Sequence, residues 1–310
     1  MIRRKPILVT GAHRSGTTFI GKMLSLDSSI AYIHEPFNLD ISGIFRYICD
    51  ENEHDMCNVI HSGFYQYICE AIRFSYSSYY HRYKISKRHS GKPPLRKALT
   101  VSRDYARLFP QRFLTPLVKD PIAVFSAEWL ASRFDMDVVV LIRHPAAFAS
   151  SLKRLNWTYN FASFLEQELL LRDYLHPFED KIDEYADTEH DIIDQSILLW
   201  RMIYHVISLY QKKHPNWLFV RHEDVSQDPV HHFEHLFQKL NLNLTPRIRK
   251  TIREYTHGPI ETLDSNHRVT RRDSKSEILK WKKALSGAEI AKIRENLMDV
   301  WNEFYSEDDW

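Results

Sequence analysis

The residues best suited to chemistry come directly after the first short apolar run. Residues 11–18 read Gly-Ala-His-Arg-Ser-Gly-Thr-Thr, so Gly11 and Gly16 stand five positions apart, the spacing of a loop that binds phosphate. Small residues let successive backbone N–H groups converge on a phosphate, and a following helix adds the positive end of its dipole. The chain has only eight glycines, which makes this pair stand out. A plain glycine turn between a strand and a helix is the alternative.

The loop lacks the lysine of enzymes that use nucleoside triphosphates. Their pattern requires Lys and then Ser or Thr after the second glycine. Here Thr17 occupies the lysine position, and Arg14 supplies a cation inside the loop. The missing lysine weakens the case for an enzyme that uses Mg-ATP.

Elements that alternate between strand and helix must position this loop and the polar groups further along the chain. Short, continuously apolar runs predict buried strands, and apolar residues at helical spacing predict the helices between them. The predicted strands cover residues 7–10, 30–33, 117–118, 138–142 and 217–220, and the predicted helices begin at Thr17 or cover residues 123–134, 191–213 and 286–305. The pattern predicts a single α/β domain over residues 1–310, with a central, mostly parallel five-stranded sheet flanked by helices. Gly21 is expected to let the first helix pack closely on that sheet.

Composition excludes several classes of protein. Hydrophobic residues make up 44% and aromatic residues 13%, which rules out a disordered or fibrous chain, and 42 Lys and Arg against 40 Asp and Glu give no general case for nucleic-acid binding. Three cysteines without a C-x-x-C pair suit a reducing compartment. No apolar run approaches the ~20 residues of a membrane span. We therefore expect a cytoplasmic protein without a membrane span.

One stretch departs from this balance. Residues 71–103 carry nine Lys and Arg and no acidic residue, and they predict a basic helical or loop insertion. Ordinary surface charge is one interpretation. The other is that the segment borders a substrate cleft and favours anionic or glycan molecules, because tyrosines stack on sugars while cations attract acidic groups.

Two motifs together resemble the sulfotransferases that use 3′-phosphoadenosine 5′-phosphosulfate (PAPS). The loop over residues 11–18 is similar to the loop of that family that holds the 5′-phosphosulfate. The second signature is an Arg after a buried strand with a Ser eight residues later, which Arg143 and Ser151 match. The resemblance is closer to the glycan and tyrosylprotein type than to the cytosolic small-molecule type. It implies a P-loop-like sulfotransferase fold and an enzyme that transfers a sulfuryl group from PAPS to a hydroxyl or amine, releases 3′,5′-ADP and needs no metal.

The resemblance also assigns the residues that bind the donor. It implies that backbone N–H groups of residues 14–18 and the hydroxyls of Thr17 and Thr18 hold the 5′-phosphate, and that Arg143 and Ser151 hold the 3′-phosphate. The set of residues in the loop is Arg14, Ser15, Gly16, Thr17 and Thr18. A surface cation and a helix-face serine are the alternatives for Arg143 and Ser151.

Catalytic roles fall on residues that follow the second and third predicted strands. An acceptor hydroxyl must lose its proton as it attacks, so a general base is expected. The resemblance implies that Glu35 is this base, since similar glycan and tyrosine sulfotransferases carry a catalytic Glu at this place, and Glu35 is favoured over the adjacent His34. A Glu35 that only caps a turn is the alternative. Lys119 in Lys119-Asp120-Pro121 resembles a lysine of the tyrosylprotein branch, which implies that Lys119, with a share from Arg14, neutralises charge on the leaving oxygen. Asp120 is expected to be an exposed turn residue and not a magnesium ligand.

A C-terminal segment completes the expected site. Arg271, Arg272 and Trp281 lie where many members of the family close a segment over the nucleotide, and Trp281 could stack on adenine or be a packed core indole. Glu223 is expected to be structural. A P-loop nucleotide kinase, and a non-catalytic protein that binds nucleotide or glycan, are the competing functions.

Overall fold

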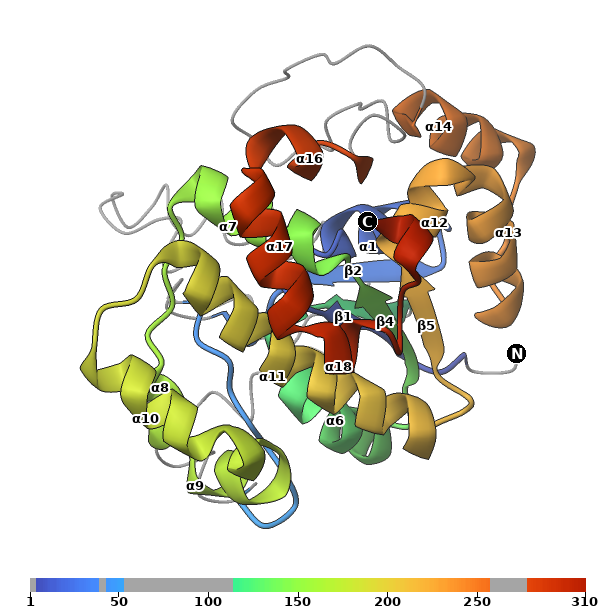
Figure 1. Cartoon of the computed structure of the whole chain (residues 1–310). Helices are drawn as coiled ribbons and strands as arrows, with labels where there is room; N and C mark the ends of the chain where they lie inside the picture. Colours follow the sequence, from blue (N-terminus) through green and yellow to red (C-terminus); the bar gives the residue numbers. More distant parts are fainter. Residues whose placement is uncertain (1–3, 39–42, 53–113, 257–277) are drawn as a thin grey trace, which may run out of the picture.

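Five parallel strands form one sheet in the order β2-β3-β1-β4-β5. The computed structural model describes residues 4–38, 43–52, 114–256 and 278–310 (Figure 1). The strands are β1 (Ile7–Gly11), β2 (Ile30–His34), β3 (Thr115–Lys119), β4 (Asp137–Ile142) and β5 (Leu218–Arg221). In register, Val9 of β1 lies beside Lys119 of β3 and beside Val139 of β4. The carboxyl ends of the strands therefore meet at one edge of the sheet.

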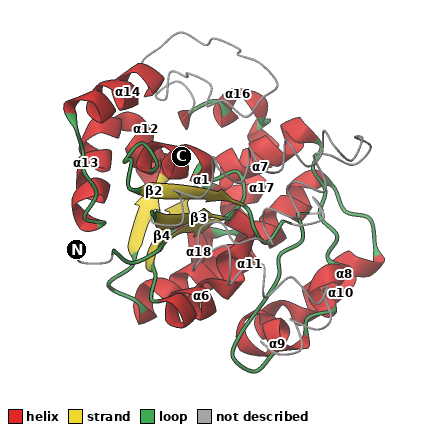
Figure 2. Ribbon diagram, turned by 180° about the vertical axis from the view of Figure 1, so that it is seen from behind, coloured by secondary structure: helices red, strands yellow, loops and turns green. Residues whose placement is uncertain are grey.

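Both faces of the sheet are covered, which explains why the strands are continuously apolar. Alternate residues of β1 and β4 belong to two different cores: Leu8 and Val140 face one, while Val9 and Val139 face the other. The first core is completed by α6 (Ala127–Phe134), α7 (Pro145–Leu155) and α11 (Ile192–Lys213). The second is completed by α1 (Thr17–Leu24), α13 (Pro229–Lys239) and α14 (Pro246–Thr256). Figures 1 and 2 show the sheet at the centre with helices around it.

Shorter elements fill the remaining described chain. Between α7 and α11 lie α8 (Ala162–Leu165), α9 (Glu168–Leu170), a π-helical turn (Leu171–Leu175), a 3₁₀ turn (His176–Phe178) and α10 (Glu179–Asp187). After β5 come α12 (His222–Gln227) and, towards the C-terminus, α16 (Trp281–Ala284), α17 (Gly287–Asn296), α18 (Met298–Trp301) and a 3₁₀ turn (Glu307–Asp309). None of the described helices is long and apolar enough to cross a membrane.

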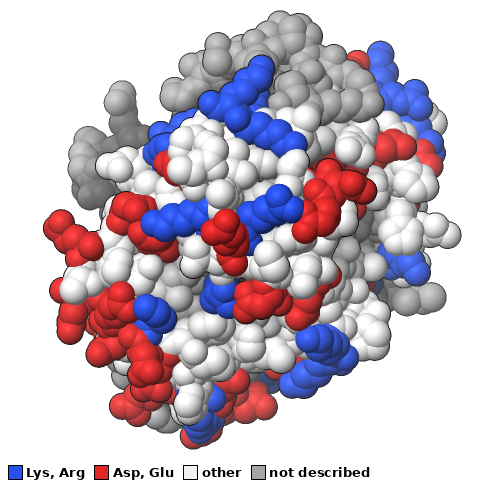
Figure 3. Space-filling model, viewed as in Figure 1, with Lys and Arg blue, Asp and Glu red and all other residues white. Residues whose placement is uncertain are grey.

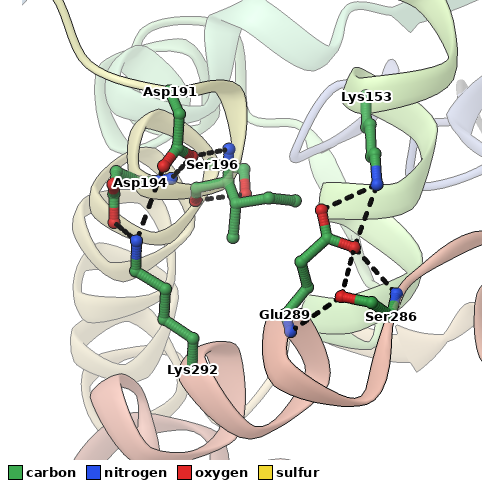
Figure 4. A network of polar contacts seen from close by, with 8 residues as sticks. Lys153, Asp191, Asp194, Ser196, Ser286, Glu289 and Lys292 are labelled. Carbon is green, nitrogen blue, oxygen red and sulfur yellow. Dashed lines mark hydrogen bonds and ion pairs between the residues drawn. The ribbon is translucent and has the colours of Figure 1, made fainter.

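An ionic network fastens α17 across α7 and α11 (Figure 4). Lys153 of α7 donates to both carboxylate oxygens of Glu289, at 2.7 and 2.9 Å. Ser286 and Glu289 form a capping box at the start of α17. On the other side, Lys292 pairs with Asp194 of α11 at 2.6 Å. The C-terminal helices thus hold the helix that carries Ser151.

The predicted elements are largely confirmed, with two corrections. All five strands form, and the helix predicted over residues 191–213 is α11, with Asp191 as its N-cap. The single helix predicted over residues 286–305 is wrong, because the backbone leaves helical geometry at Leu297 and α18 follows separately. Apolar residues spaced four apart, Ile293, Leu297 and Trp301, continue across the break, so periodicity did not show it. The helix predicted over residues 123–134 begins as a 3₁₀ turn (Pro121–Ser126). The basic segment 71–103 lies outside the described residues.

Candidate functional site

The phosphate loop requires glycine at both of its ends. Gly11 has a φ of 135°, and a Cβ there would lie 2.4 Å from the carbonyl oxygen of Leu141. Gly16 has a φ of 93°, and its Cβ would lie 2.5 Å from Nδ1 of His222. Side chains at these positions would meet both an unfavourable backbone conformation and a clash. The loop therefore passes close to β4 and α12 before α1 begins at Thr17.

Inside the loop, Ser15 and the threonines are placed differently. Ser15 is fully buried, and both its backbone N–H (3.2 Å) and its Oγ (2.5 Å) donate to the carbonyl of Ala12. Ser15 therefore shapes the loop from within. Thr17 is buried and Thr18 is exposed in the first turn of α1, where backbone N–H groups have no partner within the helix.

Arg14, Arg143 and Ser151 come together beside the loop. Nε of Arg14 donates to Oγ of Ser151 at 3.1 Å, and the Arg143 guanidinium donates to the carbonyl of Arg14. Ser151 lies two turns into α7, and it is 6% exposed. The two signatures that stand far apart in the sequence thus form one cluster of cations and hydroxyls, a set suited to phosphate groups.

Three buried side chains fix the backbone at Arg143. The Tyr204 hydroxyl accepts the Arg143 N–H at 2.6 Å, and the Trp200 indole donates to the Arg143 carbonyl at 3.1 Å. Glu223 accepts the next N–H, that of His144, at 3.1 Å, and burial raises the pKa of its carboxyl. Sequence reasoning assigned Glu223 a structural role and missed Tyr204 and Trp200, because both sit within an apolar helix pattern.

Glu35 and Lys119 form an ion pair at the ends of β2 and β3. The Lys119 side chain is fully buried, its ammonium bonds Oε1 of Glu35, and the Glu35 side chain is 24% exposed. Burial raises the pKa of Glu35, but the Lys119 ammonium and the Asn38 amide outweigh burial and hold that pKa below its ordinary value. Burial lowers the pKa of Lys119, and the Glu35 carboxylate opposes that effect. The net effect lowers the pKa of Lys119 as well, and the lowered pKa of Glu35 leaves its carboxyl ionised at neutral pH.

Helix α1 packs closely against the side chain of Lys119. A Cβ on Gly21 would lie 2.9 Å from the Tyr32 ring and 3.1 Å from Cγ of Lys119, so the glycine lets α1 approach β3, as predicted. His34 is 46% exposed, and its Nε2 lies 4.0 Å from Oε2 of Glu35. The structure thus keeps both candidate bases together, with the carboxylate facing Lys119.

One expectation is corrected here, and a second residue shows the packing that one of its two alternatives described. Asp120 is fully buried instead of exposed, because its carboxylate caps the 3₁₀ turn that follows. Trp281 is 3% exposed and stacks on His144 at 5.0 Å between ring centres, so the packed-indole alternative describes it and the adenine-stacking one does not. Arg271 and Arg272 lie outside the described residues. Among the described residues, no group of three or more His, Cys, Asp or Glu is arranged to hold a metal ion.

Charge is distributed unevenly over the surface shown in Figure 3. Lys and Arg side chains gather over α16, which carries Lys282 and Lys283. Asp and Glu side chains crowd the region of α10, whose sequence holds Glu179, Asp180 and Asp183. In this view the acidic region lies away from α16.

Comparison with known proteins identifies a family that matches the chain. The model of the sulfotransferase family matches residues 6–246. Curated proteins gave no match. Among solved structures, the sulfotransferase domain from the curacin biosynthetic pathway is 13% identical, with 96% of this chain and 99% of that chain covered and a TM-score of 0.48. Mouse sulfotransferase SULT7A1, complexed with PAP, is 11% identical, with 97% and 85% covered and a TM-score of 0.47. Sulfotransferase STF9 from Mycobacterium avium is 13% identical, with 98% and 78% covered and a TM-score of 0.45.

Proposed function

The chain belongs to the sulfotransferase family, and from this premise we propose that it transfers a sulfuryl group from PAPS to a hydroxyl or amine of an acceptor. The observation that carries the proposal is the Glu35–Lys119 pair at the ends of β2 and β3, because β3 lies directly beside the strand that enters the phosphate loop. A charged carboxylate next to a phosphate site suits removal of a proton from an attacking hydroxyl.

The residues present fit a ligand with two phosphate groups. The first turn of α1 offers backbone N–H groups and the Thr17 and Thr18 hydroxyls to a 5′-phosphate. Arg143 and Ser151 lie beside the loop and suit the 3′-phosphate, since a planar guanidinium can pair two phosphate oxygens. PAPS supplies a sulfuryl group that is already activated on a phosphate. Positioning and charge stabilisation then carry most of the catalysis.

Glu35 acts as the general base in this proposal. The acceptor O–H bond breaks and its proton passes to Glu35 while the acceptor oxygen bonds the sulfur, and the bond from sulfur to the phosphate oxygen breaks with its electron pair leaving on 3′,5′-ADP. Lys119 keeps Glu35 ionised before the reaction, since it is fully buried against that carboxylate. Lys119 has a fully buried side chain, whereas Arg14 is exposed within the loop, so we assign neutralisation of the leaving oxygen to Arg14.

A kinase is disfavoured by the bonding of Asp120. A kinase reading needs this aspartate to face a magnesium ion, but its Oδ1 accepts the Ile122 N–H at 3.1 Å and its Oδ2 accepts the Phe37 N–H at 2.7 Å. Both oxygens are buried and directed at backbone. Together with Thr17 in place of the loop lysine, this leaves no reason to invoke Mg-ATP.

Ligand-induced stabilisation separates the two functions. We expect 3′,5′-ADP at about 100 times its Kd to stabilise the protein by ~2.7 kcal/mol, and Mg-ATP to add far less. Arg143→Ala should remove the stabilisation, whereas Arg154→Ala, an exposed arginine near the end of α7, should keep it. Stabilisation by Mg-ATP alone would overturn the proposal.

Turnover tests the base. Release of 3′,5′-ADP from PAPS is measured with a tyrosine peptide, 2-naphthol and a glucosamine oligosaccharide as acceptors. Glu35→Gln should lower kcat by about 10² to 10⁴-fold with 3′,5′-ADP binding intact. His34→Gln is the matched control. If His34→Gln abolishes turnover and Glu35→Gln does not, the base is His34.

A further inference from the structure

Asp120 is a buried titratable group beside the site to which the proposed mechanism gives no role. Its side chain is fully buried, one residue after Lys119 and directly before the 3₁₀ turn of residues 121–126. Burial and the nearby Glu35 charge raise the pKa of its carboxyl to about 7, against the lowering effect of backbone N–H donors and Lys119. Burying a carboxylate costs free energy unless hydrogen bonds compensate for the lost hydration. The hydrogen-bond partners of Asp120 therefore indicate its role.

One of its two bonds is local and the other crosses between strands. Oδ1 accepts the N–H of Ile122, which caps the following turn. Oδ2 accepts the N–H of Phe37 at 2.7 Å, and Phe37 belongs to the turn after β2, 83 positions away in sequence. The second bond therefore serves the turn that carries Glu35.

That turn holds Glu35 in an uncommon backbone conformation. Glu35 has a φ of 44°, in the left-handed region, where a residue with a side chain is strained by about 1–3 kcal/mol unless its surroundings fix it. Three hydrogen bonds fix it: the Glu35 N–H donates to the Lys119 carbonyl at 2.8 Å, the Phe37 N–H donates to Asp120, and the Asn38 N–H donates to the Glu35 carbonyl at 3.2 Å. Pro36 between them has no N–H to offer.

The backbone of Asp120 joins the same turn to the phosphate loop. Its N–H donates to the carbonyl of Val9 at 3.0 Å, and its carbonyl accepts the Thr10 hydroxyl at 2.8 Å. Val9 and Thr10 are the last residues of β1 before Gly11. Asp120 thus contacts the end of β1, the end of β3 and the turn after β2 at one point.

We propose that Asp120 is a positioning residue for sulfuryl transfer: it holds the backbone of the turn so that the Glu35 carboxylate faces the acceptor next to the phosphate loop. The inference rests on the proposed function and deepens it. Asp120 acts through Glu35 and does not touch the substrate. A misplacement of about 1 Å at a catalytic group can lower turnover about 100-fold.

The test combines Asp120→Asn with Glu35→Gln in a double-mutant cycle. Asparagine keeps one acceptor oxygen and presents an NH₂ group to the second backbone N–H, so one of the two bonds is lost. In the wild-type background, kcat for release of 3′,5′-ADP from PAPS should fall about 10 to 100-fold while KM for PAPS changes less than about threefold. In the Glu35→Gln background, Asp120→Asn should lower kcat no further, because the group that it positions is gone.

Asp27→Asn is the matched control. Asp27 lies between α1 and β2, is 2% exposed and accepts the backbone N–H groups of Ser29 and Asn243 at 2.8 and 2.7 Å. It should lower the urea midpoint as Asp120→Asn does and leave kcat unchanged. If Asp120→Asn does not fold, Asp120→Ser replaces it, since serine can still cap the turn at Ile122.

The outcomes distinguish the two levels of inference. If the wild type releases 3′,5′-ADP and Asp120→Asn behaves like Asp27→Asn, the positioning role is wrong and the proposed function stands. An equal loss of kcat with and without Glu35 also refutes it, because Asp120 would then act independently. If the wild type neither binds 3′,5′-ADP nor consumes PAPS with any of the acceptors, the proposed function fails and this role fails with it.

Discussion

Replacing Lys119 with methionine tests whether the ion pair stabilises the fold as the structure indicates. Methionine fills much of the volume of the lysine stem, which packs against Gly21, and removes only the ammonium. Glu35 then remains partly buried without its cation. The variant therefore isolates the electrostatic part of the interaction.

The expected loss of stability follows from the burial of the two partners. Breaking a buried ion pair by removing one member costs about 3–5 kcal/mol, because the remaining charge is left unpaired. Lys119 is fully buried, but the Glu35 side chain is 24% exposed and therefore remains partly hydrated. We therefore expect Lys119→Met to lower the free energy of unfolding by about 2–4 kcal/mol at neutral pH.

The loss should depend on pH in a defined direction. In the wild type, the folded-state pKa of Glu35 lies below its unfolded value of about 4.3, so its contribution is present above that pH and disappears as pH falls through the folded-state pKa. In Lys119→Met, burial raises the pKa of Glu35 above its unfolded value, so the unpaired carboxylate destabilises the protein at neutral pH and is relieved by protonation. The buried Asp120, whose pKa Lys119 also lowers, loses the same cation and is relieved by protonation in the same direction. The difference in free energy of unfolding between the two proteins should therefore narrow as pH falls from about 7 towards about 4.

Urea unfolding at a series of pH values measures the difference in free energy of unfolding between the wild type and Lys119→Met. The double variant Glu35→Gln, Lys119→Met should regain part of the lost stability, because Glu35 no longer carries an unpaired charge while the buried Asp120 still lacks the lysine. Lys213→Met, which removes a 67% exposed lysine from its pair with Glu128, should cost less than ~1 kcal/mol. A difference that stays constant with pH, or a double variant as unstable as Lys119→Met, would show that packing and not charge is responsible.

Three further predictions concern the loop, the Arg143 turn and the C-terminal network. Gly16→Ala should destabilise the protein by about 1–3 kcal/mol and weaken binding of 3′,5′-ADP in calorimetry, because the new Cβ meets His222 at a φ of 93°; unchanged affinity would contradict a phosphate site there. Glu223→Leu should raise the Kd for 3′,5′-ADP about fivefold or more while kcat changes little, since leucine cannot accept the His144 N–H and so loosens the backbone next to Arg143; a loss of kcat alone would refute this role. Glu289→Ala should cost less than ~2 kcal/mol in urea unfolding and leave nucleotide affinity unchanged, because it removes a capping box and a pair with the exposed Lys153 while the buried contacts of α7 around Ser151 remain.

Local patterns sufficed for the strands, the loop and the second signature. A strand covered on both faces must be apolar at every position, so β1 and β4 could be recognised from short runs alone. A loop that approaches a phosphate needs glycine where φ is positive, and Gly11 and Gly16 meet that requirement within six residues. Arg143 and Ser151 could be paired because they match a signature of the family that the chain resembles, an Arg after a buried strand and a Ser eight residues later.

Local patterns failed where a side chain has two plausible environments. Trp281 could have been exposed to a nucleotide or buried, and only the packing of His144 against it decided for burial. The end of α17 was missed because the apolar spacing continues across the break at Leu297. The sequence pattern around Trp281 is the same whether the indole is buried or exposed, and the apolar spacing at Leu297 is the same whether the helix continues or ends.

The sequence by itself determined where the strands lie and which polar residues follow them. Apolar runs and glycine spacing are local patterns, and they depend only on neighbours a few positions away. The tertiary structure decided what those residues contact. The order β2-β3-β1-β4-β5 brings Glu35 to Lys119 across 84 positions and Asp120 to Phe37 across 83, and it buries Asp120, which the sequence alone suggested was exposed. Contacts of this kind depend on which strands lie side by side. The order of the strands is fixed only when helices distant in sequence pack on both faces of the sheet.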